Sequence, residues 1–145
     1  MQHHVETRSE RSREEHVLLA DDDPSIRRGL AAVLEKAGLF VTQVSDGAEA
    51  VTEMEHSIFE VLVLDMMMPR VTGWQVIEWI TANPKHKPRV VIVLTASDRK
   101  ILYELDPEAV NAILFKPFDI QELAGYVAAC CRGLRTAVPP PELTP

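Results

Sequence analysis

The chain has 145 residues, of which 46% are hydrophobic, and its formal net charge is −7. This length and apolar content suffice for one buried core but not for two ordinary domains, so we expect a single globular domain. An acidic chain without a dense stripe of lysine and arginine is a poor match for phosphate backbones, so we expect no direct nucleic-acid partner.

A membrane role is also not expected. No apolar run approaches the ~20 residues that span a bilayer, and the polar start MQHHVETRSERSREEH lacks the apolar centre of a secretory signal. These features predict a cytoplasmic protein without membrane contact. Cys130 and Cys131 are adjacent and cannot form a framework of long-range disulfides, so we expect them to be packing residues.

Five short segments rich in aliphatic and β-branched residues predict β-strands that begin near His16, Leu39, Glu60, Arg89 and Val110. Segments with helical spacing alternate with them, over residues 25–36, 48–55, 73–82, 98–105 and 120–132. Near-continuous apolar strands are typical of a sheet buried on both faces, and intervening helices are typical of crossovers between parallel strands. The pattern predicts a three-layer α/β sandwich around a five-stranded parallel sheet.

Cap and turn residues support these boundaries. Asp23 can cap the first helix with Pro24 in its first turn, Gly38 can end it, and Asn83 followed by Pro84 can end the third. Residues 1–15 are polar without an apolar period and residues 134–145 are rich in proline, so we expect flexible tails around a domain at residues 16–133.

Polar side chains follow the predicted strands at their carboxyl ends. Asp21 and Asp22 follow the first strand, Asp65 the third, Thr95 the fourth and Lys116 the fifth. Each has an ordinary structural explanation, because acidic residues complement helix dipoles and threonine is common in turns. In open parallel sheets, however, ligands bind outside the carboxyl ends of the strands, where these side chains would meet.

Crowded carboxylates raise one another's pKa values unless a cation lies nearby, and hard oxygen ligands favour Mg²⁺. The ammonium of Lys116 and the hydroxyl of Thr95 would complete a pocket for a small tetrahedral anion. The sequence therefore predicts a magnesium site that accepts a phosphoryl group.

The segments LADDDPSIRR, VLVLDMMMPRVTG, VIVLTAS and ILFKPF, in this order and at these intervals, resemble the receiver domain of two-component response regulators over about residues 16–133. The resemblance is to single-domain receivers of the chemotaxis-regulator kind in particular. It implies a flavodoxin-like fold with sheet order 2-1-3-4-5, which periodicity alone does not give.

Carried over to matching positions, the resemblance implies that Asp65 is the phosphoacceptor, a nucleophile that takes a phosphoryl group from a sensor histidine kinase or phosphotransfer protein. It implies that Asp22, Asp65 and the backbone carbonyl of Met67 ligate Mg²⁺, and that Asp21 acts through a metal-bound water. The chain would then be a signalling domain rather than an enzyme, although it assists its own phosphorylation and dephosphorylation.

The remaining matched positions concern switching. The resemblance implies that Thr95 and Lys116 contact phosphoryl oxygens after transfer and bias a rearrangement of the neighbouring loops. Pro117 would follow a cis peptide bond that aims the lysine inward. Ala96 is small, which in the family leaves the phosphoryl site accessible.

Two positions depart from the family pattern. Ile113 stands where the family has Tyr, Phe or His as a rotating switch, and a β-branched side chain is stiff at χ1, so we expect a different coupling to the output surface. Met67 is apolar where a polar side chain assists hydrolysis in fast-cycling relatives, which predicts slow self-dephosphorylation.

The sequence bears on four alternatives to a stand-alone receiver that accepts a phosphoryl group. A phosphatase that forms an aspartyl phosphate needs a second acid two residues after Asp65, where Met67 stands. A flavin carrier needs a hydroxyl- and glycine-rich loop after the first strand, where DDDPSI stands. A phosphorylation-independent scaffold remains an alternative, because Ile113 departs from the switch pattern. We expect a stand-alone receiver that signals through a target protein; a fragment of a longer hybrid kinase or regulator is the other possibility, because residues 139–141 resemble a linker.

Overall fold

The computed structural model describes residues 15–96 and 100–131, and these contain five strands and five α-helices. In chain order the elements are β1 (His16–Ala20), α1 (Pro24–Lys36), β2 (Phe40–Val44), α2 (Gly47–His56), β3 (Val61–Asp65), α3 (Gly73–Ala82), the 3₁₀ helix η2 (Pro84–His86), β4 (Val90–Thr95), α4 (Ile101–Glu104), β5 (Ala112–Phe115) and α5 (Ile120–Cys131). The predicted tails lie outside the described residues, except for Glu15.

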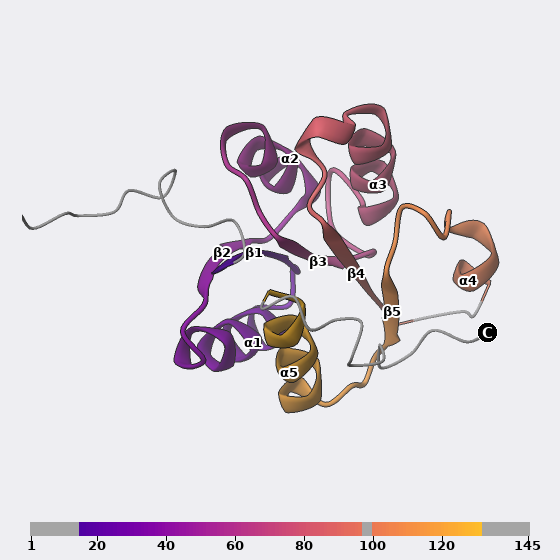
Figure 1. Cartoon of the computed structure of the whole chain (residues 1–145). Coiled ribbons are helices and arrows are strands. Elements are labelled where there is room, and N and C mark those ends of the chain that lie inside the picture. The colour runs from indigo at the N-terminus through magenta and orange to yellow at the C-terminus, as the bar shows by residue number, and fades with distance from the viewer. Residues whose placement is uncertain (1–14, 97–99, 132–145) are drawn as a thin grey trace, which may run out of the picture.

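All five strands are parallel and form one sheet in the order β2-β1-β3-β4-β5. Helices α1 and α5 cover one face of this sheet, and α2 and α3 lie on the other (Figure 1). The arrangement is the flavodoxin-like three-layer sandwich, so the predicted α/β class and strand order are both confirmed.

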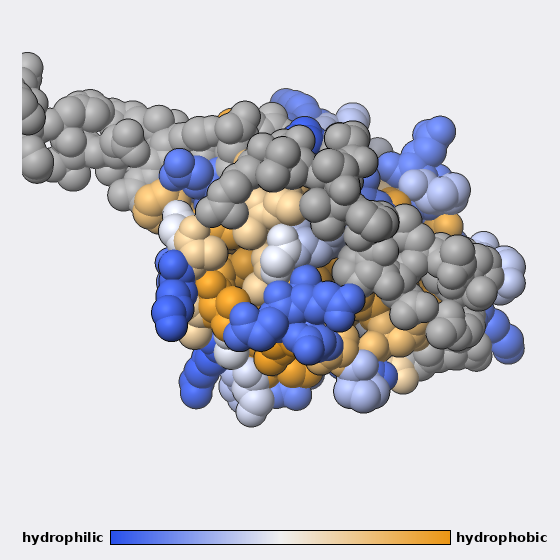
Figure 2. All heavy atoms as spheres, turned by 60° about the horizontal axis from the view of Figure 1, so that its bottom comes forward, coloured by the Kyte–Doolittle hydropathy of each residue, from blue (hydrophilic) through white to orange (hydrophobic). Residues whose placement is uncertain are grey.

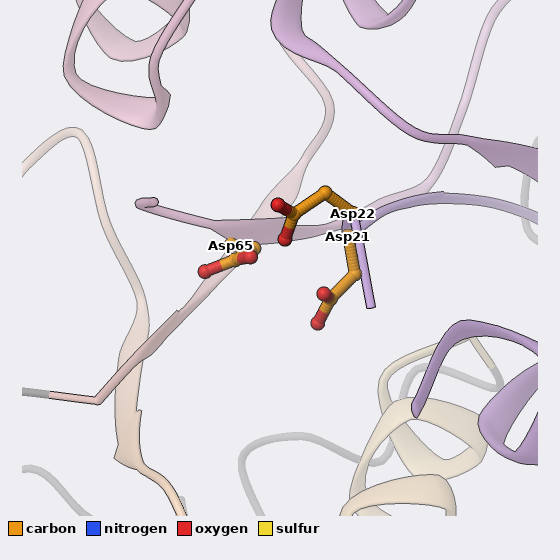
Figure 3. A group of neighbouring side chains, drawn as sticks. All are labelled: Asp21, Asp22 and Asp65. Carbon is orange, nitrogen blue, oxygen red and sulfur yellow. The ribbon is translucent and has the colours of Figure 1, made fainter. Parts of the chain in front are cut away.

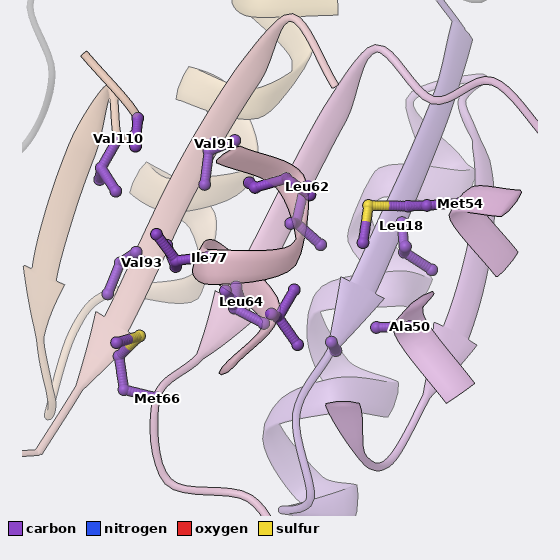
Figure 4. Packing of buried hydrophobic residues seen from close by; sticks show 14 of the residues in the cluster. Leu18, Ala50, Met54, Leu62, Leu64, Met66, Ile77, Val91, Val93 and Val110 are labelled. Atoms are coloured by element: carbon purple, nitrogen blue, oxygen red, sulfur yellow. The ribbon is translucent and has the colours of Figure 1, made fainter. Parts of the chain in front are cut away.

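Two apolar layers fill the space between the sheet and its helices. Successive residues of a strand point to opposite faces, so Leu18 and Leu62 pack toward α2 and α3 (Figure 4), whereas Val17 and Val61 pack toward α1 and α5. Every residue of β1, β3 and β4 is buried, which explains the continuous apolar runs. Cys130 and Cys131 are buried in the layer under α5, as expected of packing residues.

The predicted caps of α1 are confirmed. The side chain of Asp23 accepts hydrogen bonds from the amides of Ser25 and Ile26, at 2.9 and 3.4 Å, and Pro24 occupies the first turn. Gly38 follows the helix with a φ of 93°, a left-handed conformation that glycine adopts without steric cost. Helix α3 ends before Asn83, as predicted.

The fourth helix differs from the prediction. A helix was expected over residues 98–105, but the described helix is Ile101–Glu104, and Ser97, Asp98 and Arg99 lie outside the described residues. Leu105 leaves the helix with extended backbone angles, and Asp106 precedes Pro107, a position that disfavours helical geometry. Strand β2 begins at Phe40 rather than Leu39, and it is a partly exposed edge strand.

Figure 2 brings the side of α1 and α5 forward and shows hydrophobic surface between hydrophilic side chains. Among the described residues, no helix combines the length and the apolar character that crossing a bilayer requires.

Two loops at the carboxyl edge of the sheet are joined backbone to backbone. The amide of Gly47 donates to the carbonyl of Val71 at 3.0 Å, and a Cβ on Gly47 would lie only 2.3 Å from that oxygen. Beside this contact Arg70 pairs with buried Asp46, and the hydrogen bond from its guanidinium holds the pKa of Asp46 below its ordinary value. The contact fixes the loop that follows Asp65.

We predict that Gly47→Ala destabilises the protein by about 1–3 kcal/mol, because the new Cβ forces a backbone carbonyl to move. The matched control is Gly125→Ala, which lies in α5 with open space around its Cβ and should stabilise by about 0.5–1 kcal/mol. Urea unfolding measures both changes; equal stabilities of the two variants would contradict the close approach of the loops.

Candidate functional site

Three carboxylates meet at the carboxyl edge of the sheet. One carboxylate oxygen from each of Asp21, Asp22 and Asp65 lies within 4.8 Å of the other two, and Figure 3 shows the side chain of Asp22 reaching toward Asp65. The register of the sheet causes this, because Ala20 pairs with Leu64 and the next residue of each strand is an aspartate. Asp21 and Asp65 are buried, whereas Asp22 is exposed.

The two buried carboxylates make similar local turns. Asp21 Oδ1 accepts from the amide of Asp23 at 2.9 Å, and Asp65 Oδ1 accepts from the amide of Met67 at 3.1 Å. Such bonds to an amide two residues further on are typical of aspartate turns. Within the described residues, the Oδ2 atoms of Asp21 and Asp65 are buried without a hydrogen-bond donor.

The lysine that directly follows the fifth strand faces these two oxygens. Lys116 Nζ lies 3.4 Å from Asp21 Oδ2 and 3.6 Å from Asp65 Oδ2. The Lys116 amide donates to the carbonyl of Thr95 at 2.8 Å, and the peptide bond from Lys116 to Pro117 is cis, as the resemblance implies. One ammonium cannot neutralise three ionised carboxylates, so the cluster retains negative charge.

Burial is the main cause that raises the pKa of Asp65 to about 7, and the charge of Asp21 adds to this. The hydrogen bond from the Met67 amide and the charge of Lys116 act in the opposite direction. Near neutral pH the cluster therefore either keeps a proton on Asp65 or requires a further cation.

The donor set fits Mg²⁺. Carboxylate and carbonyl oxygens are its preferred protein ligands, and the buried Oδ2 atoms of Asp21 and Asp65 have lone pairs that no described donor satisfies. Among the described residues, the group of three or more Asp, Glu, His or Cys side chains that lie close enough to share a metal ion is Asp21, Asp22 and Asp65.

Thr95 is the last residue of β4 and is buried. It lines a cavity of about 210 Å³ together with Met67, whose side chain is 65% exposed, and with Trp74 of α3. Ala96 is exposed. Ile113 of β5 is buried, and its side chain packs in the apolar layer that faces α2 and α3.

Three residues whose contacts position the loops around the acidic cluster were not identified from the sequence. Arg27 donates from its guanidinium to the backbone carbonyl of Asp21 at 2.9 Å, which ties the first turn of α1 to the acidic cluster. Gly73 brings α3 against the residue after Asp65, because a Cβ there would lie 2.6 Å from the Cα of Met66. Arg70 was also missed. Only Gly73 had a recognisable signal, a glycine at a helix start; the two arginines had none.

The chain matches the response regulator receiver domain family over residues 17–128 and therefore belongs to it. It is 31% identical over 117 residues to the response regulator RR06 of Streptococcus pneumoniae, across 81% of this chain and 53% of that protein. It is also 31% identical to the response regulator receiver protein CpdR of Brucella abortus, across 77% of this chain and 92% of that protein.

Solved structures agree with the family assignment. The response regulator protein TrrA from Thermotoga maritima, in complex with Mg²⁺ and BeF, superposes with a TM-score of 0.68 at 27% identity, over 80% of this chain and 98% of that one. The chain spans about half the length of several curated relatives, RR06 among them. It is thus a receiver domain of two-component response regulators.

We predict that the metal-free protein loses stability as the pH rises from about 4 to 7, because Asp65 titrates near 3.8 when unfolded and near 7 when folded. The folded protein binds the Asp65 proton more tightly than the unfolded chain does. This contribution to stability is fully present below pH 3.8, the pKa of the unfolded state, and it is lost as the pH rises through about 7, the pKa of the folded state. Between pH 5 and pH 7 the loss should be on the order of 2 kcal/mol.

Asp65→Asn should remove this dependence, and Glu35→Gln on α1 should keep it. Urea unfolding with EDTA at several pH values measures the effect. An Asp65→Asn variant with the same pH profile as the parent protein would contradict the assignment.

Proposed function

We propose that this receiver accepts a phosphoryl group on Asp65 from a histidine kinase or phosphotransfer protein, and that phosphorylation switches a surface that binds a target protein. One observation carries the proposal: three carboxylates have oxygens within 4.8 Å of one another, and an ammonium lies 3.6 Å from Asp65. Membership of the response regulator receiver domain family supports it.

In this proposal, Asp22, Asp65 and the backbone carbonyl of Met67 hold Mg²⁺, and Asp21 acts through a bound water. When bound, Mg²⁺ would neutralise charge on the carboxylates and on the phosphoryl oxygens. Asp65 supplies the nucleophilic carboxylate oxygen, which forms the new bond to phosphorus while the bond from phosphorus to the kinase imidazole breaks. The imidazole nitrogen leaves with the electron pair of that bond.

Two side chains stabilise the product. The ammonium of Lys116 already faces Asp65 Oδ2 and is placed to pair with a phosphoryl oxygen. Thr95 ends the neighbouring strand and would donate its hydroxyl to another oxygen, which couples the phosphoryl group to the cavity between β4 and α3. Small, exposed Ala96 would leave access to this pocket.

The domain is proposed to act in signalling, in the cytoplasm, and not as an enzyme with an external substrate. Met67 stands two residues after Asp65 and offers no general acid for a phosphatase cycle. A phosphorylation-independent scaffold is the second candidate, because Ile113 is buried and β-branched and provides no ring that can rotate. Both proposals apply equally to a stand-alone receiver and to a receiver within a longer regulator.

We predict that incubation with acetyl phosphate and Mg²⁺ adds one phosphoryl group per chain, because Asp65 is the acceptor. Asp65→Asn should abolish the adduct, Lys116→Ala should reduce it at least about 10-fold through lost charge stabilisation, and Glu35→Gln should leave it unchanged. Intact-protein mass spectrometry measures the adduct. A full adduct on Asp65→Asn would refute the acceptor, and no adduct on the parent protein would favour the scaffold.

We predict that Met67→Asn shortens the lifetime of the phosphorylated protein by on the order of 10-fold, less than the 10²–10⁴ of full general acid-base catalysis. The exposed thioether lies beside the site and cannot orient water, whereas an amide can. Met67→Leu, which stays apolar, is the matched control. Phosphate release from purified phosphoprotein gives the lifetime; equal lifetimes for the Asn and Leu variants would contradict the role of position 67.

A further inference from the structure

A second hollow lies beside the proposed phosphoryl pocket, between α3 and the end of α4. Its volume is about 460 Å³, and Trp74 and Glu104 line both this hollow and the 210 Å³ cavity that contains Thr95. We call the two together the α3–α4 groove. One end of the groove is thus formed by residues around Asp65, and the other extends along α3.

The floor of the groove is apolar. Ile77 and Leu105 belong to the hydrophobic layer under α2 and α3 and are each 7% exposed, and Trp74 packs against this layer. All three line the larger hollow. Trp74 is only half-buried, unlike the fully buried leucines of the same layer. A partly exposed tryptophan beside aliphatic side chains is typical of surfaces that contribute strongly to protein binding.

The rim of the groove is acidic. Glu78 of α3, Glu104 of α4 and Asp106 line the larger hollow, and all three side chains are exposed. Lys100 lines the smaller cavity, so three acidic side chains and one basic side chain surround the whole groove within the described residues. This charge favours a cationic occupant and disfavours nucleic acid, phosphopeptides and anionic lipid surfaces.

A small-molecule site is a poorer match for the larger hollow. Such sites usually combine an apolar pocket with a few buried polar groups that orient the ligand. Here the polar side chains that line the hollow, including Thr81, are all exposed. An apolar floor with an exposed acidic rim matches an amphipathic segment of a protein instead.

We propose that the α3–α4 groove docks a segment of a partner protein in which large apolar side chains alternate with lysine or arginine. The apolar side chains pack on Trp74, Ile77 and Leu105, and the basic side chains pair with the acidic rim. The docked segment also contacts Trp74 and Glu104 at the wall of the phosphoryl pocket. The coupling of docking to phosphorylation rests on the proposed function, whereas docking itself does not.

The test uses the full chain labelled with ¹⁵N and a synthetic 14-residue amphipathic peptide of leucine and lysine. The peptide should shift the amide signals of Ile77 and Leu105 and the indole signal of Trp74. A peptide of the same pattern with glutamate in place of lysine, and one with serine in place of leucine, should bind at least about 10-fold more weakly, because each lacks one half of the match.

A charge-reversed variant separates the groove from general attraction to an acidic protein. Glu78→Lys combined with Glu104→Lys should weaken binding at least about 10-fold, whereas Glu35→Lys combined with Glu55→Lys, which changes net charge equally on α1 and α2, should stay within about 2-fold. The proposal would be overturned if both double variants bound the lysine peptide equally weakly, or if the glutamate peptide bound the parent protein as tightly as the lysine peptide does. Signal shifts confined to other surfaces would also overturn it.

The groove's other possible occupant is the chain's own first segment, which contains Arg8, Arg11 and Arg13. Converting these arginines to glutamate in the full chain should leave the signals of the groove unchanged without peptide. If the signals move, the groove is occupied by the chain itself and the partner proposal is overturned. Peptide binding does not require phosphorylation, so its failure leaves the acetyl phosphate result unaffected.

Discussion

The structure depends on the crowding of carboxylates where β1 and β3 end side by side. Asp21 and Asp65 are fixed there by the sheet register, and each keeps one buried oxygen without a hydrogen-bond donor among the described residues. The two carboxylates could move apart only if β1 shifted along β3, and both strands are buried along their whole length. The repulsion between these carboxylates is therefore built into the fold. A proton, the ammonium of Lys116 or a divalent cation can reduce it, and the proposed chemistry uses the divalent cation.

The surroundings of the site explain how this repulsion is maintained. Backbone-to-backbone contact at Gly47 and Gly73 and the hydrogen bond from Arg27 hold the loops around the acidic residues. None of these groups needs to touch a phosphoryl group. Their effect is positional, because a rigid set of oxygens binds a small cation better than a set that must first be ordered. The same loops leave Met67 exposed and Trp74 partly exposed, and Trp74 lines both the cavity beside Thr95 and the larger hollow of the α3–α4 groove.

Much of the fold and of the candidate site could be predicted from the sequence, for identifiable reasons. Strands buried on both faces have continuous apolar runs, and residues that directly follow such strands share one edge of the sheet, which is why Asp21, Asp65 and Lys116 were found. Periodicity does not encode strand order, which came from the resemblance. The ends of α4, the contact of Gly47 with Val71 and the role of Arg27 depend on which loops meet in space. Trp74 packs against the apolar layer under α2 and α3, but the groove that its remaining surface lines depends on where the end of α4 lies, which the sequence does not give.

The central claim is that the acidic cluster binds a divalent cation and that Asp65 then accepts phosphorus beside Lys116 and Thr95. A crystal structure of the full chain with Mg²⁺ and beryllofluoride, a stable mimic of the phosphoryl group, tests it most directly. The account predicts the metal between Asp22 and Asp65, beryllium bonded to a carboxylate oxygen of Asp65, and fluorides in contact with Lys116 and Thr95. Beryllofluoride on another residue, or a cluster without metal while Lys116 still faces the carboxylates, would contradict it.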